Sequence, residues 1–227
     1  MKSQQSGFTL VEIAIVLVII GLLLGGILKG QELINSAKVK NVANDFRTIQ
    51  TYVYGYQDKY RALPGDDPAA DTHLASSGIT AAKGNGNGII EGMWNSCVAA
   101  SEAMMFWQHV RAAGLAPGGT TLPTSAGECE DFLPKNAFGG KVGYASYIGT
   151  AVGAVAANAQ ITGMSGTYQI CSEKILGRFV AQLDLQLDDG KPDSGSMRAI
   201  LQADVGTPKA AVSTIEDGAT YVVCMAY

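Results

Sequence analysis

The sequence has few histidines and no excess of basic residues. The 227 residues include 2 histidines, and Lys plus Arg total 16 against 20 Asp plus Glu. A mildly acidic balance gives no support to nucleic-acid binding. Neither His73 nor His109 lies beside a Ser or Cys motif, so we expect both to be surface or core residues without a catalytic role. The stretch Gly139-Gly140-Lys141 lacks the spacing and the following Ser or Thr of a phosphate-binding loop.

Charge and proline are missing from the first part of the chain. Between Phe8 and Leu28 the one charged residue is Glu12, and no proline precedes Pro64. As a helix rising about 1.5 Å per residue, this run would span about 30 Å, which is enough to cross the hydrocarbon of a bilayer. A carboxylate in such a helix costs about 2 to 3 kcal/mol, so Glu12 needs a function.

The start of the run also lacks the features of an ordinary secretory signal. Only Lys2 supplies positive charge ahead of it, and Leu24-Gly25-Gly26 is a poor version of the expected cleavage site. The segment Gly7-Phe8-Thr9-Leu10-Val11-Glu12 instead resembles the type III signal of type IV pilins and type II secretion pseudopilins. In those proteins a dedicated peptidase cuts after the glycine and N-methylates the next residue. The resemblance implies cleavage after Gly7 and a mature protein that begins at N-methylated Phe8.

Cleavage at that bond would create an α-amino group one helical turn from Glu12, a spacing that places both groups on one helix face. Glu12 would then neutralise the amine of its own chain or that of a neighbouring subunit during assembly. Both arrangements fit the spacing. The resemblance favours the second, because the family glutamate is thought to set the register of the growing filament.

Beyond Leu28 the helical pattern continues but becomes one-sided. Apolar residues spaced alternately by three and four predict one buried stripe, made of Val39, Val42, Phe46, Ile49, Val53, Tyr56, Tyr60 and Leu63. The sequence therefore predicts one continuous helix from about Phe8 to Ala62, which Pro64 ends.

Four glycines fall inside the predicted helix, at positions 21, 25, 26 and 30. Each costs a helix about 1 kcal/mol relative to alanine. Two interpretations stay open, namely close helix-to-helix approach in an assembly and a locally melted stretch.

The four cysteines show no C-x-x-C spacing, which favours disulfides over a metal site and an oxidising compartment. We expect Cys97 to pair with Cys129 and Cys171 with Cys224, one of three possible connectivities. Free buried thiols are the alternative.

Two segments are weak candidates for binding calcium. The first, Gly84 to Glu91, resembles part of an EF-hand loop, with Asn85 and Asn87 as oxygen donors and Ile90 pointing into the core. Lys83 and Trp94 occupy the positions of its acidic ligands, so we favour a hydrogen-bonded Asn/Gly turn.

The second candidate is acidic and follows a predicted helix. Asp184, Asp188, Asp189 and Asp193 have the carboxylates to surround a hard cation. Because their spacing fits no known loop, we favour a solvated acidic helix end, and we expect no cofactor apart from this possibility of calcium.

The remaining sequence predicts mixed short elements. We expect a helix from Asn95 or Ser96 to about Ala113, a loop-rich stretch over 116–140 and strands within 142–170. A helix is expected over 172–188, a half-buried strand over 197–205 and a last strand over 221–227.

Together these features indicate an α+β, pilin-like fold, in which a long N-terminal helix packs on an antiparallel β-sheet head with short helices and disulfide-stapled loops. The expected divisions are a leader over 1–7, a transmembrane or filament-core half over 8–28, a head-packing half over 29–63 and a globular head over 64–227.

The resemblance implies a structural, non-enzymatic subunit that waits in the inner membrane with its head in the periplasm and then enters a surface pilus. Implied partners are copies of itself, the prepilin peptidase, an inner-membrane assembly platform and minor pilins. The alternatives are a type II secretion pseudopilin and, further off, a membrane-anchored periplasmic binding domain or enzyme.

Overall fold

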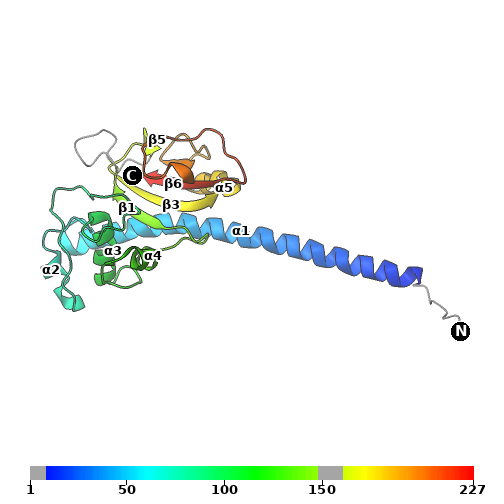
Figure 1. Cartoon of the computed structure of the whole chain (residues 1–227), viewed down its shortest axis with the longest axis horizontal. Coiled ribbons are helices and arrows are strands. Elements are labelled where there is room, and N and C mark those ends of the chain that lie inside the picture. The colour runs from blue at the N-terminus through cyan, green and yellow to red at the C-terminus, as the bar shows by residue number, and fades with distance from the viewer. Residues whose placement is uncertain (1–8, 148–160) are drawn as a thin grey trace. The chain divides into compact units, whose positions relative to one another are not determined.

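The computed structural model describes residues 9–147 and 161–227. The chain divides into two compact units, Met1–Lys38 and Val39–Tyr227, and each is described by itself. The first unit contains the start of helix α1, and the second contains the remainder of that helix and all other elements (Figure 1).

Helix α1 (Leu10–Tyr60) is unbroken. In the first unit every large apolar side chain from Leu10 to Leu28 is exposed, with exposed fractions between 46% at Ile20 and 87% at Leu10. The helix is intact at all four glycines of this unit. It is long and apolar enough to cross a membrane, so the expectation of a long apolar N-terminal helix is confirmed.

In the second unit α1 becomes one-sided, as the periodicity predicts. Its buried residues are Val39, Val42, Ala43, Phe46, Ile49, Val53 and Tyr56. Tyr60 is half-buried, and the helix ends there rather than at Ala62. Arg61 ends it, because its φ of 57° is left-handed and cannot continue an α-helix.

The head contains a four-stranded antiparallel sheet in the order β1-β3-β6-β4. These strands are β1 (Val142–Ser146), β3 (Tyr168–Leu176), β4 (Met197–Leu201) and β6 (Thr220–Ala226). A short parallel pair joins β2 (Ile161–Thr162) to β5 (Lys209–Ala210), and the 3-10 turn η3 (Gln202–Asp204) follows β4.

Short helices complete the head. They are α2 (Ala70–His73), the 3-10 turn η1 (Ala75–Ser77), α3 (Glu102–Ala112), α4 (Ala126–Phe132) and α5 (Gly177–Leu187). The buried stripe of α1, one face of α3, the sheet and α5 share a single apolar core. The α+β, pilin-like architecture is thereby confirmed.

The helix expected over 172–188 is wrong in its first part. Residues up to Leu176 belong to β3, and α5 begins at Gly177. Pairing of β3 with β6 overrides the helical spacing of Ile175 and Leu176. The change from strand to helix occurs at Gly177. A larger residue does not fit there, because a Cβ would lie 2.0 Å from the carbonyl oxygen of Glu216.

Other boundaries also differ from expectation. The helix expected from residue 95 or 96 begins only at Glu102, where Ser101 caps it by accepting the N–H of Met104. The stretch over 116–140 contains α4, capped by Ser125. The strand expected over 197–205 ends at Leu201, while the last strand is present as β6.

The cysteines form two disulfides, Cys97–Cys129 and Cys171–Cys224. These are the pairs expected from the sequence. Cys171 and Cys224 lie directly opposite each other on β3 and β6, the two central strands.

Candidate functional site

The first site is the start of α1, where Thr9 and Glu12 cap the helix reciprocally. The backbone N–H and the hydroxyl of Thr9 donate to Oε2 of Glu12 at 2.8 and 2.7 Å. The N–H of Glu12 donates in return to the Thr9 hydroxyl at 3.3 Å. This arrangement is a capping box, which satisfies donors that a helix N-terminus leaves unpaired.

Sequence reasoning paired Glu12 only with an α-amino group and missed Thr9. The T-x-x-E spacing was the available signal. Gly7 and Phe8, the expected cleavage and methylation residues, lie outside the described residues. The expected contact between Glu12 and an amine therefore stays a prediction. In the described part of the chain, only Oε2 of Glu12 has a hydrogen-bond partner, so Oε1 can still accept one.

Comparison with known proteins addresses this end of the chain. Residues 2–28 match the family model of the prokaryotic N-terminal methylation motif. The chain carries the prepilin signal of type IV pilins and pseudopilins. No curated protein and no solved structure matches the chain. The motif and the apolar helix behind it support a single-pass anchor in the inner membrane, and they point to a structural subunit of this class.

The first calcium candidate, the loop Gly84–Glu91, lies in the head. Its backbone surrounds the carboxylate of Asp66. Asp66 is 3% exposed. Its Oδ1 accepts the N–H groups of Gly86 and Asn87 at 2.6 and 3.2 Å, and its Oδ2 accepts that of Gly88 at 2.7 Å. Backbone donors therefore point inward, as in an anion-binding nest, whereas a cation loop points oxygens inward.

The two asparagines of the loop are engaged with other groups. The side-chain oxygen of Asn85 accepts the N–H of Asn87, and that of Asn87 accepts the N–H of Ile89. Their amide nitrogens donate to the two carboxylate oxygens of Glu91 at 3.0 and 3.1 Å. The loop is thus the hydrogen-bonded Asn/Gly turn that we favoured, and Ile90 is buried as expected.

A second buried acid ties the loop to α3. Glu102 is 5% exposed, and its two carboxylate oxygens accept the N–H groups of Asn85 and Glu91. Burial is the main cause that raises its pKa, and the neighbouring charges of Asp66 and Glu91 raise it further. Sequence reasoning assigned no role to Asp66 or Glu102, because their partners are backbone groups from distant positions.

The two histidines are parts of hydrogen-bond networks. His109 is fully buried, with Nδ1 accepting the N–H of Gly65 and Nε2 donating to the carbonyl of Ala82. Burial lowers its pKa, so this ring stays neutral. His73 lies 2.7 Å from Oδ2 of the buried Asp67, which also accepts the hydroxyl of Tyr56.

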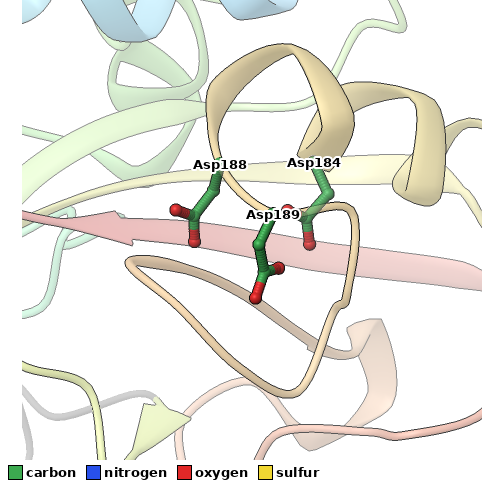
Figure 2. Close-up of side chains that lie close together, drawn as sticks. All are labelled: Asp184, Asp188 and Asp189. Atoms are coloured by element: carbon green, nitrogen blue, oxygen red, sulfur yellow. The ribbon is translucent and has the colours of Figure 1, made fainter.

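The acidic segment at the end of α5 contains the second calcium candidate. Asp184, Asp188 and Asp189 come together, each with one carboxylate oxygen within 4.8 Å of the others (Figure 2). The expectation of a solvated helix end is wrong for Asp184, which has no exposed surface. It holds for Asp189, which is exposed.

Proposed function

We propose that this chain is a structural subunit of a type IV pilus-like filament. The observation that carries the proposal is the methylation motif at residues 2–28 together with the exposed apolar part of α1, Leu10–Leu28, that overlaps it. Each large apolar side chain gains about 1.5–3 kcal/mol when it leaves water. The segment Leu10–Leu28 therefore needs a bilayer or other apolar helices around it, and an inner-membrane stage followed by a filament core supplies both in turn.

Processing would precede assembly. The prepilin peptidase would cut between Gly7 and Phe8 and methylate the new α-amino group of Phe8. Glu12 follows Phe8 by four residues, which is the spacing of about one helical turn. Because the capping box with Thr9 occupies only one of its carboxylate oxygens, the other is available for the amine of a neighbouring subunit. A charge pair formed in this way would set the register between copies.

The head suits a subunit that is exported. Its two disulfides are typical of an oxidising compartment. In the proposed order of events, the head folds in the periplasm, an inner-membrane platform lifts the subunit, and minor pilins join the same filament. The product would be a surface fibre that supports adhesion or motility.

A type II secretion pseudopilin uses the same subunit design in a short periplasmic filament that drives export. A membrane-anchored periplasmic enzyme or binding domain, in contrast, would tolerate loss of Glu12 and would keep an uncut or conventionally cut N-terminus. The location of the fibres distinguishes a pilus subunit from a pseudopilin. Dependence of assembly on Glu12 distinguishes both from an anchored enzyme or binding domain.

The test compares Glu12→Ala with Glu32→Ala in cells that express the full chain. Glu32 is a matched control, since it is an exposed acid of the same helix that pairs with Lys29. We expect equal membrane levels and equal leader cleavage for both variants, but sheared fibres from Glu32→Ala only. Fibres on intact cells support a pilus, whereas a filament confined to the periplasm supports a pseudopilus. Normal fibres from Glu12→Ala would refute the role of Glu12 between subunits.

A further inference from the structure

The head contains a groove of about 170 Å³ between α1, α3 and the start of β1. Its apolar walls include Ile49 from α1, Trp107 from α3 and Val142 from β1, all of which belong to the core. For comparison, an engineered apolar cavity of about 150 Å³ binds a benzene molecule. The groove therefore has room for an apolar group of about that size.

Polar groups of α1 line the same groove at helical spacing. Asp45, Thr48 and Tyr52 are separated by three and four positions, so their side chains follow one face of the helix. All three are half-buried. In the described part of the chain, none of their side-chain oxygens has a hydrogen-bond partner. An apolar hollow with a few unpaired polar groups is the usual composition of a small-molecule site.

The charge of Asp45 is not compensated from within the head. Among residues 9–147 and 161–227, it forms no ion pair with a basic side chain. Two basic residues also line the groove, but both are engaged elsewhere. Arg111 donates to three backbone carbonyl groups at 2.7 to 3.2 Å, and Lys135 pairs with Asp131 at 3.6 Å. A carboxylate partly removed from water in this way gains free energy from a cation.

Tyr52 adds an aromatic surface close to that carboxylate. Burial is the main cause that raises the pKa of its phenol, and the charge of Asp45 raises this pKa further. The ring of Trp107 already has the guanidinium of Arg111 at 5.6 Å from its centroid. Tyr52, in contrast, forms no ring or cation–π contact with any described residue. Its ring can therefore still interact with an organic cation.

We propose that this groove binds a small organic ammonium ion whose apolar body is about the size of a benzene ring. The ammonium group would pair with Asp45, and the hydroxyl of Thr48 is a further acceptor for its three N–H donors. The apolar body would lie against Ile49 and Tyr52, where it gains free energy by leaving water. A neutral analogue would leave Asp45 unpaired, and an anionic one would be repelled. The site belongs to the head, so binding is independent of the role proposed for Glu12.

The test uses the full chain in micelles of a nonionic detergent at pH 7.5, with ¹⁵N-labelled tryptophan. The chain has two tryptophans, Trp94 and Trp107. Trp107 lines the groove and Trp94 does not, so the indole N–H signal of Trp94 reports effects away from the site. Both signals are followed by NMR during separate titrations with benzylamine, benzyl alcohol and benzoate. These probes have similar sizes and differ in charge.

Three variants accompany the wild type. Asp45→Asn removes the charge and keeps the size of the side chain. Thr48→Leu fills part of the groove from a helix position at which leucine is favourable. Asp58→Asn is the matched control, because Asp58 is an exposed acid of α1 that does not line the groove.

We expect benzylamine at about millimolar concentration to shift the Trp107 signal saturably and to leave the Trp94 signal unchanged. Benzyl alcohol and benzoate should bind at least about tenfold more weakly, because they do not pair with the carboxylate. Benzylamine should lose a similar factor in Asp45→Asn, should bind more weakly to Thr48→Leu, and should bind normally to Asp58→Asn. The proposal is overturned if benzylamine gives no saturable shift, if benzyl alcohol or benzoate binds as tightly, or if Asp45→Asn keeps the affinity of the wild type.

Discussion

Oδ2 of Asp66 accepts the backbone N–H of Gly88 at 2.7 Å, across 22 positions of sequence. Together with the bonds from Gly86 and Asn87 to Oδ1, this contact makes a buried carboxylate the centre of the Gly84–Glu91 loop. The loop thus surrounds a carboxylate of the chain itself, in agreement with the hydrogen-bonded Asn/Gly turn that the sequence favoured over a calcium loop.

Replacement of Asp66 tests that arrangement. Asp66→Asn places an amide N–H₂ against a backbone donor, and it weakens hydrogen bonds that a charged acceptor makes strong. We expect a loss of about 2–4 kcal/mol in the free energy of unfolding, measured by chemical denaturation of the head. Asp58→Asn is the control, since this exposed acid of α1 forms only a 3.8 Å pair with Arg61. Equal stability of the two variants would show that the loop does not depend on Asp66.

The capping box predicts local fraying when the Thr9 hydroxyl is removed. Thr9→Ala should destabilise the first turn of α1 by about 1 kcal/mol. Amide hydrogen exchange at Ile13 and its neighbours in micelles should then quicken about fivefold. Thr9→Ser keeps the hydroxyl and should exchange like the wild type. Unchanged protection in Thr9→Ala would mean that this cap does not hold the helix start.

The two disulfides should differ in their effect on stability. They close loops of similar length, with separations of 32 and 53 residues, so the chain-entropy contribution is about 4 kcal/mol for each. Cys171 and Cys224 are both fully buried in the central strands, whereas in the other pair Cys129 is buried and Cys97 is exposed. We expect the Cys171→Ala/Cys224→Ala pair to lower the Tm more than Cys97→Ala/Cys129→Ala, because it removes two buried sulfur atoms from the core rather than one.

The two disulfides should also differ in how readily they are reduced. A mild reductant should open Cys97–Cys129 first, because Cys97 is an exposed residue that an attacking thiolate can approach. Mass spectrometry after alkylation reports which thiols appear. Early labelling of Cys171 or Cys224 in the native protein would contradict the described burial.

Asp45 gives a prediction about pH. It lines a groove with Ile49, Trp107 and Val142, and burial raises its pKa to about 6. The native state therefore binds this proton more tightly than the unfolded state, so stability falls as the pH rises from about 4 to about 6. Asp45→Asn should be close to neutral at pH 4 and stabilising by about 1 kcal/mol at pH 7.5, after allowance for solvent screening.

Paired measurements on the wild type and Asp45→Asn at each pH isolate this effect from other groups. His109 has the opposite sign, since its lowered pKa makes the native state lose stability as the pH falls. The difference between the two proteins cancels that contribution. If the difference in stability between the wild type and Asp45→Asn did not change with pH, burial would not raise the pKa of Asp45.

The sequence predicted features that depend on local pattern. The buried stripe of α1 follows from spacings of three and four, and the exposed apolar run from composition. It failed where distant groups decide the outcome. Ile175 has helical spacing, but pairing with β6 makes it a strand residue. Asp66 and Glu102 carry no local signal, because their partners are backbone N–H groups 11 to 22 positions away.

The candidate sites divide in the same way. Thr9 and Glu12 are three residues apart, so their cap was readable from the sequence. The burial of Asp184 was not, because it depends on how α5 packs against the sheet and how the loop 188–197 folds back over Asp188. This tertiary packing decides whether the end of α5 is solvated or buried, and it cannot be predicted from the spacing of the aspartates.

The central claim is that the chain is processed as a prepilin, and the mass of its mature N-terminal peptide tests this most directly. Protein purified from membranes is digested, and the N-terminal peptide is identified by tandem mass spectrometry. The account predicts a peptide that begins at N-methylated Phe8. A mature N-terminus at any other residue would contradict it.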